Sequence, residues 1–295
     1  MRLEENVPLA RLTTIGTGGP ARYLARPRSV AELREAFARA AAAGLPVEVI
    51  GLGSNVLAAD RGVEAVVVRL EGALAEARAA GTVLVAGGGA TNAVCLHRAR
   101  AAGLGGLEFA SAIPGTVGGG VRMNAGAYGV EFRDVLLDAT VVDAAGEATL
   151  GPDELDLAYR RSSLRDGQVV VRVRLQLHRR DRDAIKAEVA ALAARRKATQ
   201  PTTRRTFGSV WKNPPGDSAG RLIEACGLKG ARAGGAVISA RHANFIENGG
   251  GATSADCLAL MVEARRRVYE LFGIVLEHEV RFLGPLALPP LGPAG

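Results

Sequence analysis

The apolar and polar positions near the start of the chain follow the order strand, helix, strand. Residues 20–27 predict a strand, and an apolar face at helical spacing predicts the helix after it. That face consists of Val30, Leu33, Phe37 and Ala40. Ser29 and Glu32 stand where a capping box would start such a helix. A short apolar strand over residues 46–50 leads into GLGSNVL, residues 51–57. The pattern therefore places a glycine-rich loop at the carboxyl end of a strand.

The rest of the chain carries further strand and helix patterns. Strands are predicted at 66–70, 83–86, 236–239 and 274–283, with a hairpin that turns near residues 145–146. Helices are predicted at about 91–102, 183–198, 219–226 and 253–272. Residues 168–178 alternate between apolar and polar side chains, which is typical of an edge strand or of a strand with one buried face. The helix at 183–198 is polar, which is typical of a connection between domains.

Residues 111–129, SAIPGTVGGGVRMNAGAYG, form a glycine-rich segment that also carries apolar side chains. Six of these residues are glycine and Pro114 removes a backbone donor, so we expect neither a helix nor a central strand. Gly118, Gly119 and Gly120 can present consecutive N–H groups as an anion site. A structural Ω-loop explains the composition equally well. A further glycine run, residues 87–89, precedes the helix predicted at 91–102.

Composition and charge indicate a folded chain and leave the partner open. With 295 residues, 48% hydrophobic and 23% charged, the chain is long enough for two or three domains. The net charge of +7 suits an anionic partner. However, the densest basic runs, such as residues 265–267, lack interleaved aromatic side chains, and no zinc finger or RNP motif is present. A basic nucleic-acid-binding module therefore remains only as a disfavoured alternative, and we expect no nucleic-acid partner.

The cysteines and histidines give no metal-binding or disulfide pattern. Cys95, Cys226 and Cys257 are far apart and odd in number, which fits a reducing compartment. The four histidines show no metal-ligand spacing, so we expect no metal. No secretory leader and no apolar run of membrane-spanning length is apparent. We therefore expect a cytoplasmic protein without membrane insertion, as a monomer or weak oligomer.

Three polar groups beside glycine-rich loops are candidates for chemistry. Arg160, in the cluster YRRS, suits a substrate carboxylate held by two hydrogen bonds. Ser209 lacks the nucleophile-elbow motif of hydrolases, but a serine can donate a proton to a strongly basic carbanion beside it. For Glu279, the spacing alone favours an exposed carboxylate paired with Arg281.

The motifs GLGSNVL, AIPGTVGGGVRMNAGAYG, YRRS, GSVWKNP, HANFIEN and EHEVRF occur in this order between Gly51 and Phe282. Together they resemble the UDP-N-acetylenolpyruvoylglucosamine reductases, the MurB family. The resemblance implies an α+β fold, with a two-lobed FAD-binding domain of the vanillyl-alcohol-oxidase (PCMH) type and a smaller α+β substrate-binding domain. The implied limits are 1–180 for the first domain (lobes about 1–70 and 71–180), 181–200 for a connecting helix, 201–284 for the second and 285–295 for a flexible tail.

By position, the resemblance makes Arg160, Ser209 and Glu279 the catalytic residues. In the family reaction NADPH reduces non-covalently bound FAD, and hydride then passes from flavin N5 to C3 of the enolpyruvyl group of UDP-N-acetylglucosamine enolpyruvate. Ser209 would give a proton to C2, while Arg160 and Glu279 orient the substrate carboxylate. The product, UDP-N-acetylmuramate, implies a role in peptidoglycan and cell-wall synthesis, and so in cell shape, cell division and the cell cycle.

The family pattern also implies contacts with both ligands. The FAD contacts are Gly51, Leu52, Gly53, Ser54, Asn55, Ser111, Pro114, Gly115, Thr116, Gly118, Gly119, Asn124 and Gly126. The UDP-sugar contacts are Lys212, Asn213, Asn244 and Arg204. The short interval from Ser163 to Ser209 leaves no room for the tyrosine-lid subdomain of the longer MurB class, so we expect the shorter class. Trp211 stands where Phe is commoner, and a flavin oxidase or dehydrogenase for another small alcohol or lactone remains an alternative.

Overall fold

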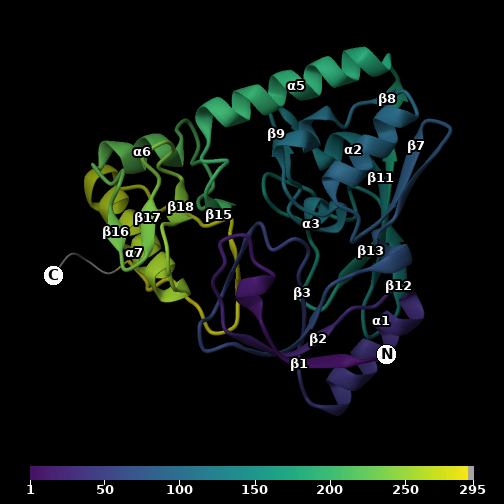
Figure 1. Cartoon of the computed structure of the whole chain (residues 1–295), viewed down its shortest axis with the longest axis horizontal. Helices are drawn as coiled ribbons and strands as arrows, with labels where there is room; N and C mark the ends of the chain where they lie inside the picture. The colour runs from purple at the N-terminus through teal and green to yellow at the C-terminus, as the bar shows by residue number, and fades with distance from the viewer. Residues whose placement is uncertain (292–295) are drawn as a thin grey trace. The chain divides into compact units, whose positions relative to one another are not determined.

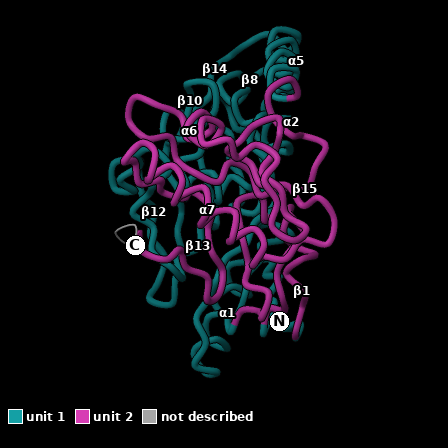
Figure 2. Tube along the Cα trace, turned by 90° about the vertical axis from the view of Figure 1, so that its left-hand side faces the viewer, with its two compact units in different colours: residues 1–5, 22–52, 64–196 teal, residues 6–21, 53–63, 197–295 magenta. Residues whose placement is uncertain are grey.

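The computed structural model describes residues 1–291. The chain divides into two compact units, each built from separate stretches of sequence (Figure 2). The first unit contains residues 1–5, 22–52 and 64–196, and the second contains residues 6–21, 53–63 and 197–291. The domain limits expected from sequence are consecutive segments of the chain, and those limits stay a prediction. The loop GLGSNVL passes from the first unit to the second after Leu52.

One lobe of the first unit is a four-stranded sheet covered by a helix (Figure 1). In order across the sheet, its strands are β1 (Leu3–Pro8), β2 (Pro20–Ala25), β5 (Val63–Val68) and β3 (Val47–Val49). β3 pairs parallel to β5, with Val47 opposite Val66. On helix α1 (Val30–Ala42), Leu33, Phe37 and Ala40 of the predicted apolar face are buried in one core cluster with Val66 and Val68, and Val30 is partly buried against it. The predicted strand–helix–strand opening is confirmed.

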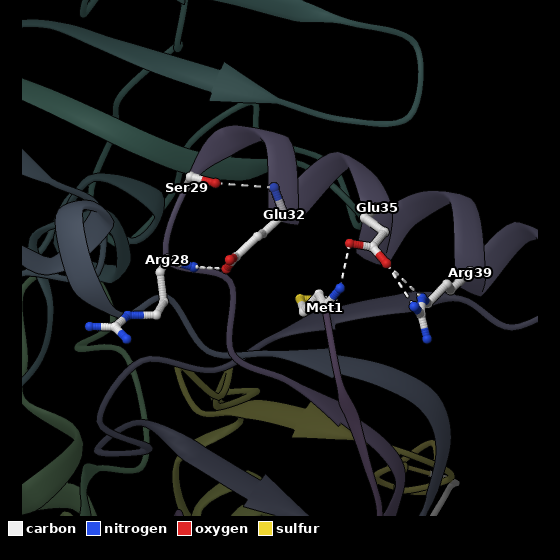
Figure 3. Close-up of polar contacts among 6 residues, drawn as sticks. All are labelled: Met1, Arg28, Ser29, Glu32, Glu35 and Arg39. Atoms are coloured by element: carbon white, nitrogen blue, oxygen red, sulfur yellow. Dashed lines mark hydrogen bonds and ion pairs between the residues drawn. The ribbon is translucent and has the colours of Figure 1, made fainter.

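The start of α1 shows that its capping box is only half formed (Figure 3). Ser29 is the N-cap, and its hydroxyl accepts a hydrogen bond from the Glu32 N–H at 3.2 Å. The Glu32 carboxylate accepts from the Arg28 N–H at 2.7 Å instead of returning to Ser29. One turn later Glu35 binds the Met1 ammonium at 2.6 Å, and this contact lowers the pKa of Glu35. The chain terminus is thereby fastened to the helix.

The other lobe of the first unit is a five-stranded antiparallel sheet. Its strands, in order, are β12 (Glu147–Leu150), β11 (Leu136–Val142), β13 (Val169–Gln176), β7 (Val83–Gly87) and β6 (Ala77–Ala80). β13 is not an edge strand, because it pairs with β11 on one side and β7 on the other. Its exposed residues alternate with buried ones from Val171 onward, so the interpretation of a single buried face is confirmed there. Helix α2 (Asn92–Ala101) packs on this sheet, and the predicted hairpin turns at Gly146.

The glycine-rich segment contains a short helix, α3 (Val117–Arg122), so the expectation that it would avoid helix is wrong. Thr116 caps this helix by accepting from the Gly119 N–H at 3.3 Å. A Cβ on Gly118 would lie 2.7 Å from the Gly88 oxygen, and one on Gly120 would lie 2.4 Å from the Phe132 ring. Close packing against neighbouring backbone and an aromatic ring therefore requires glycine in a helix that its intrinsic propensity disfavours.

Gly88→Ala is expected to destabilise the first unit. A Cβ at this position would lie 1.7 Å from the backbone oxygen of Val170, which belongs to the central strand and cannot move aside as a side chain could. We expect the free energy of unfolding to fall by about 3 kcal/mol, the upper end of the usual cost of overpacking. The measurement is the midpoint of thermal unfolding, which should be lower. Gly146→Ala is the matched control, because a Cβ there has no heavy atom within 4 Å. Equal midpoints for the two variants would contradict the close approach.

The second unit is a four-stranded antiparallel sheet with two helices packed on it. The strands are β15 (Arg205–Ser209), β18 (Phe245–Asn248), β17 (Ala236–Ile238) and β16 (Arg232–Ala233), and the helices are α6 (Ala219–Ala225) and α7 (Ser254–Phe272). Thr253 caps α7 through a complete capping box with Asp256, and Gly273 ends the helix at a φ of 68°. Both ends of α7 therefore lie where the sequence predicts them.

The predicted last strand is much shorter than its alternating pattern suggests. Only Arg281–Leu283 form a strand, β19, which pairs parallel to β4 (Val56–Ala58). Leu276 and Val280 are buried, so the alternation reflects packing of irregular chain and not a sheet ladder. Residues 285–291, part of the expected flexible tail, contact the second unit through Leu286 and Leu288, and residues 292–295 lie outside the described part.

The remaining elements are short turns and connections, apart from one long helix. That helix is α5 (Arg182–Thr199), close to the range predicted from sequence. The others are η1 (Leu9–Arg11), η2 (Gly72–Ala75), β8 (Leu104–Gly105), η3 (Glu108–Ala112), β9 (Gly126–Ala127), β10 (Val130–Glu131), α4 (Phe132–Val135) and β14 (His178–Arg179). Across residues 1–291, no helix combines the length and apolar composition needed to cross a bilayer.

Candidate active site

Three glycine-rich segments meet in the first unit. A Cβ on Gly51 would lie 2.7 Å from the Thr116 hydroxyl, so the first loop touches the start of α3. The Gly118 N–H donates to the Gly88 carbonyl at 2.9 Å, which joins the second glycine run to the third. Segments that are far apart in sequence therefore pack together closely, through contacts that leave no room for a side chain at Gly51 or Gly118.

The proposed nest of consecutive N–H groups is not available in this structure. The N–H groups of Val117 and Gly118 donate to the backbone oxygens of Ala90 and Gly88, each at 2.9 Å. Those of Gly119 and Gly120 donate to Thr116, at 3.3 Å to its hydroxyl and 2.8 Å to its carbonyl. Since Gly88 and the N-cap residue Thr116 accept from these three donors, the interpretation of residues 118–120 as an anion nest is wrong.

Asn92, which the sequence analysis missed, holds the adjacent loop. Its side-chain N–H donates to the Ile113 carbonyl at 2.8 Å, and its backbone N–H donates to the Gly115 carbonyl at 3.0 Å. The side chain is only 2% exposed. The sequence offered one signal for Asn92, its position in the first turn of a predicted helix. An asparagine there is at least as typical of a helix cap as of a residue that binds a loop.

Two buried polar atoms at this loop fit a polar ligand. Among residues 1–291, the Ser111 hydroxyl and the Asn92 side-chain oxygen have no hydrogen-bond partner. Buried polar atoms are nearly always paired, so such atoms call for a partner that the chain does not supply. The hydroxyl, ring and phosphate groups of a flavin nucleotide offer suitable partners for both atoms. The residues present therefore fit FAD.

Arg160 lies in the first unit in a strained backbone conformation. Its φ is 55°, a left-handed value unusual for a residue with a side chain. Its guanidinium donates to the Gly126 carbonyl at 2.9 Å and lies 5.0 Å from the centre of the Tyr159 ring. Asn124 and Tyr128, at φ values of 39° and 56°, are strained in the same way in the neighbouring loop. Strained residues often gather where function fixes a side chain.

Asn124 is a buried residue that supports this cluster through hydrogen bonds. It is fully buried, and its side-chain oxygen accepts from the Arg133 N–H at 3.0 Å. Its side-chain N–H groups donate to Glu131 at 2.7 Å and to the Ala158 carbonyl at 3.1 Å. The amide is fully used within the chain. The structure therefore places Asn124 as a support for the segment that carries Arg160, while its predicted contact with FAD stays a prediction.

The second unit brings Ser209 and Glu279 onto neighbouring extended segments. β15 pairs with β18 up to Thr206, shifts register at Gly208, where φ is 84°, and resumes with Ser209 opposite Phe245. Beyond Ser209, the Glu279 N–H donates to the Val210 carbonyl at 2.9 Å. Ser209 and Glu279 are both partly exposed. The segments that carry two of the three predicted catalytic residues are therefore neighbours, joined by a backbone hydrogen bond.

The second half of the first glycine-rich loop is joined to both of these segments. The Asn55 side-chain N–H donates to the Glu279 carbonyl at 2.8 Å. The Thr14 hydroxyl contacts two backbone oxygens, that of Gly53 at 3.2 Å and that of Thr206 at 2.6 Å. Thr14 was missed from sequence because these partners are 39 and 192 residues away. Gly53, Ser209 and Glu279 therefore belong to one connected framework.

The four predicted UDP-sugar contacts all lie in the second unit, with different exposure. Lys212 is half-buried, with its ammonium 3.3 Å from Glu277, and Arg204 is exposed, 3.9 Å from Glu247. The exposed Asn213 accepts from the Ala219 N–H at 3.1 Å. Asn244 differs, because it is only 4% exposed and its amide is used on the backbone of Trp211.

The cysteines of the described part of the chain are free thiols, and two of them, Cys95 and Cys257, are buried. Burial raises the pKa of Cys95 and of Cys257 to about 12, so both stay as thiols at neutral pH. Within residues 1–291, no group of three or more His, Cys, Asp or Glu side chains is placed to hold a metal ion.

Comparison with known proteins defines the class and then the family. Residues 21–150 match the family described as "FAD binding domain", and residues 200–283 match "UDP-N-acetylenolpyruvoylglucosamine reductase, C-terminal domain". An FAD-binding domain followed by this C-terminal domain defines an FAD-containing oxidoreductase. The UDP-N-acetylenolpyruvoylglucosamine reductase of Novosphingobium aromaticivorans is 45% identical over 96% of each chain, and that of Rubrobacter xylanophilus is 45% identical over 94% of each. The chain belongs to the UDP-N-acetylenolpyruvoylglucosamine reductase family, MurB.

A solved structure supports the same assignment. The crystal structure of UDP-N-acetylenolpyruvylglucosamine reductase from Thermus caldophilus matches with a TM-score of 0.82 at 40% identity. The match covers 96% of this chain and 99% of that one. The predicted fold class, α+β with an FAD-binding domain and a separate C-terminal domain, is confirmed.

Proposed function

We propose that the protein reduces the enolpyruvyl group of UDP-N-acetylglucosamine enolpyruvate to give UDP-N-acetylmuramate, with NADPH as the electron donor. The observation that carries the proposal is the pairing of the Ser209 and Glu279 segments, in a chain that matches a named reductase over 96% of its length. An acid and a carboxylate beside a flavin loop are what hydride addition to an enol ether requires.

The cofactor contacts proposed are those that the glycine-rich loops offer. Gly51, Thr116 and the buried Ser111 hydroxyl would contact FAD, as would Gly53 and Ser54 of the loop GLGSNVL. When bound, FAD supplies the hydride that reaches C3 of the substrate. The chain itself would bind the nucleotide through these loops and position the acid that protonates the substrate.

Three side chains would donate the proton and bind the group on which negative charge develops. The Ser209 hydroxyl would donate a proton to C2 once the hydride has been added. Arg160 offers a planar fork that can bind the substrate carboxylate with two hydrogen bonds, and Glu279 would help to orient the same group. Lys212, Asn213 and Arg204 would meet the UDP-sugar, because their side chains are not fully buried.

The product places this reaction in the synthesis of peptidoglycan precursors. We propose that the enzyme works in the cytoplasm, where its nucleotide substrates are found, and that it serves cell-wall biogenesis.

The test is an anaerobic absorbance experiment on the purified protein. The flavin bands are expected to bleach with NADPH and to return when UDP-N-acetylglucosamine enolpyruvate is added. A flavin that bleaches but returns only with a different acceptor would favour the alternative flavin oxidase or dehydrogenase. A colourless protein that takes up no added FAD would contradict the proposal altogether and would reopen the nucleic-acid alternative, for which duplex binding with a steep salt dependence is the readout.

A further inference from the structure

The chain just after Ser209, beyond the last paired residue of β15, is held by hydrogen bonds to one asparagine, Asn244. The Val210 N–H donates to the Asn244 carbonyl at 2.9 Å. The Trp211 N–H donates to the Asn244 side-chain oxygen at 2.9 Å, and the Asn244 side-chain N–H donates to the Trp211 carbonyl at 2.8 Å. The amide thus pairs with both main-chain groups of one residue, as a neighbouring strand would.

The other side of the same stretch is held by the segment of Glu279. The Glu279 N–H donates to the Val210 carbonyl, and the Lys212 N–H donates to the Glu277 carbonyl, each at 2.9 Å. Residues 210–212 therefore lie between the Asn244 side chain and the chain that bears Glu279. Any shift of this stretch moves Ser209 relative to Glu279.

We infer that Asn244 is a positioning residue for Ser209, which sets where the serine hydroxyl stands when it protonates the substrate. This inference rests on the proposed function, in which Ser209 is the proton donor. It gives Asn244 a role different from the direct UDP-sugar contact expected from sequence. A residue that is 4% exposed, with both amide atoms engaged by Trp211, has little left to offer a ligand.

Both the side chain and the backbone N–H of Asn244 have hydrogen-bond partners within the chain. Trp211 is 2% exposed, so its N–H and carbonyl have no water to replace a lost partner. The backbone N–H of Asn244 donates to the Nδ1 atom of His242 at 3.2 Å. Burial lowers the pKa of His242, with the charge of Lys229 adding to the effect, and the ring is therefore neutral at pH 7 and can accept that bond.

The test separates positioning from ligand binding by following the oxidative half-reaction alone. The flavin is reduced with dithionite under anaerobic conditions, mixed with increasing UDP-N-acetylglucosamine enolpyruvate, and followed by its returning absorbance. In Asn244→Ala the limiting rate is expected to fall about 10²-fold, the size of effect that a misplacement of about 1 Å can have. The substrate concentration at half-maximal rate should change less than about threefold, since no ligand contact is removed.

Asn248→Ala is the matched control. Asn248 is the last residue of β18, the strand that begins directly after Asn244, and its side-chain amide makes three hydrogen bonds, to Ile15, Gly250 and Ala252, but none to the Ser209 strand. It should lower the unfolding midpoint while keeping the limiting rate. Rates are expressed per bound flavin, so that unfolded protein does not contribute.

A second variant guards against a failure of Asn244→Ala to fold. Asn244→Asp keeps the size of the side chain and the acceptor for the Trp211 N–H, but turns an oxygen toward the Trp211 carbonyl in place of the donor. If the amide positions the strand, this variant should also lose rate at saturating substrate, whereas a side chain that only fills space would be replaced without loss.

The outcomes are distinguishable. A limiting rate in Asn244→Ala equal to that of Asn248→Ala overturns the inference, and so does a large rise in the half-saturating concentration at an unchanged limiting rate, which would return Asn244 to ligand binding. Failure of the reduced wild-type protein to be reoxidised by this substrate would overturn the proposed function, and the inference with it.

Discussion

Ser209→Ala is expected to stop the oxidative half-reaction while leaving the reductive one intact. Without the hydroxyl, the substrate carbanion has no acid beside it, and the rate of flavin reoxidation by the enolpyruvyl UDP-sugar should fall by at least about 10³-fold. Bleaching of the flavin by NADPH should proceed as in the wild type, because no proton is delivered to the UDP-sugar in that step. The measurement is stopped-flow absorbance under anaerobic conditions, one half-reaction at a time.

The structure gives this variant a clean interpretation. Ser209 is partly exposed, and its backbone is held by Phe245 and by the contacts of Val210, none of which uses the hydroxyl. Removing one oxygen should therefore leave the strand in place. Reoxidation at the wild-type rate would show that the proton comes from elsewhere, and parallel losses in both half-reactions would indicate a damaged flavin site instead.

Elements with local signals were predictable from sequence. α1 and α7 combine a capping residue with an apolar face at helical spacing, and both begin at the residues after the predicted caps, Ser29 and Thr253. These signals act within a few residues and need no tertiary partner, so propensity and spacing suffice.

Elements that depend on distant packing were not predictable. α3 contains three glycines, and it exists because Gly118 and Gly120 pack against Gly88 and Phe132. The alternation in residues 274–283 was interpreted as a strand, although most of it is irregular chain with Leu276 and Val280 turned into the core. In both cases contacts with other parts of the chain outweigh the local pattern.

The candidate site was found by motif resemblance more than by residue chemistry. Spacing alone left Glu279 as an exposed carboxylate, and the structure places its segment against Val210, about 70 residues earlier in the chain. Thr14 and Asn92 gave no usable signal, because the loops they hold are identified only once the chain is folded.

Three of the four asparagines predicted from sequence to contact ligands, all except Asn213, share one structural role. Asn55 donates to the Glu279 carbonyl, Asn124 donates to the Ala158 carbonyl near Arg160, and Asn244 pairs with Trp211 near Ser209. Each amide thus supports the backbone next to one of the three proposed catalytic residues. A short, rigid side chain that both donates and accepts can replace a missing strand partner where the chain is irregular. Asparagine at a glycine-rich site can therefore indicate support as well as ligand contact.

Arg160→Lys is expected to slow flavin reoxidation by the enolpyruvyl UDP-sugar about 10²- to 10³-fold, although the positive charge is kept. Lysine carries one compact ammonium and cannot offer the planar fork that binds a carboxylate with two hydrogen bonds as charge develops. It would also weaken the contacts with Gly126 and with the Tyr159 ring that hold the guanidinium in place. The measurement is the limiting rate of reoxidation at saturating substrate.

Arg161→Lys is the matched control for this last variant, because the next residue along the chain is an exposed arginine paired with Asp156 at 2.7 Å. An exposed ion pair contributes little, so both the rate and the unfolding midpoint should stay near the wild-type values. Unlike Arg161, Arg160 has a φ of 55°, a conformation that costs energy and persists only where the surroundings impose it. If the two variants behaved alike, charge alone would account for Arg160, and the strained backbone would have no part in orienting the carboxylate.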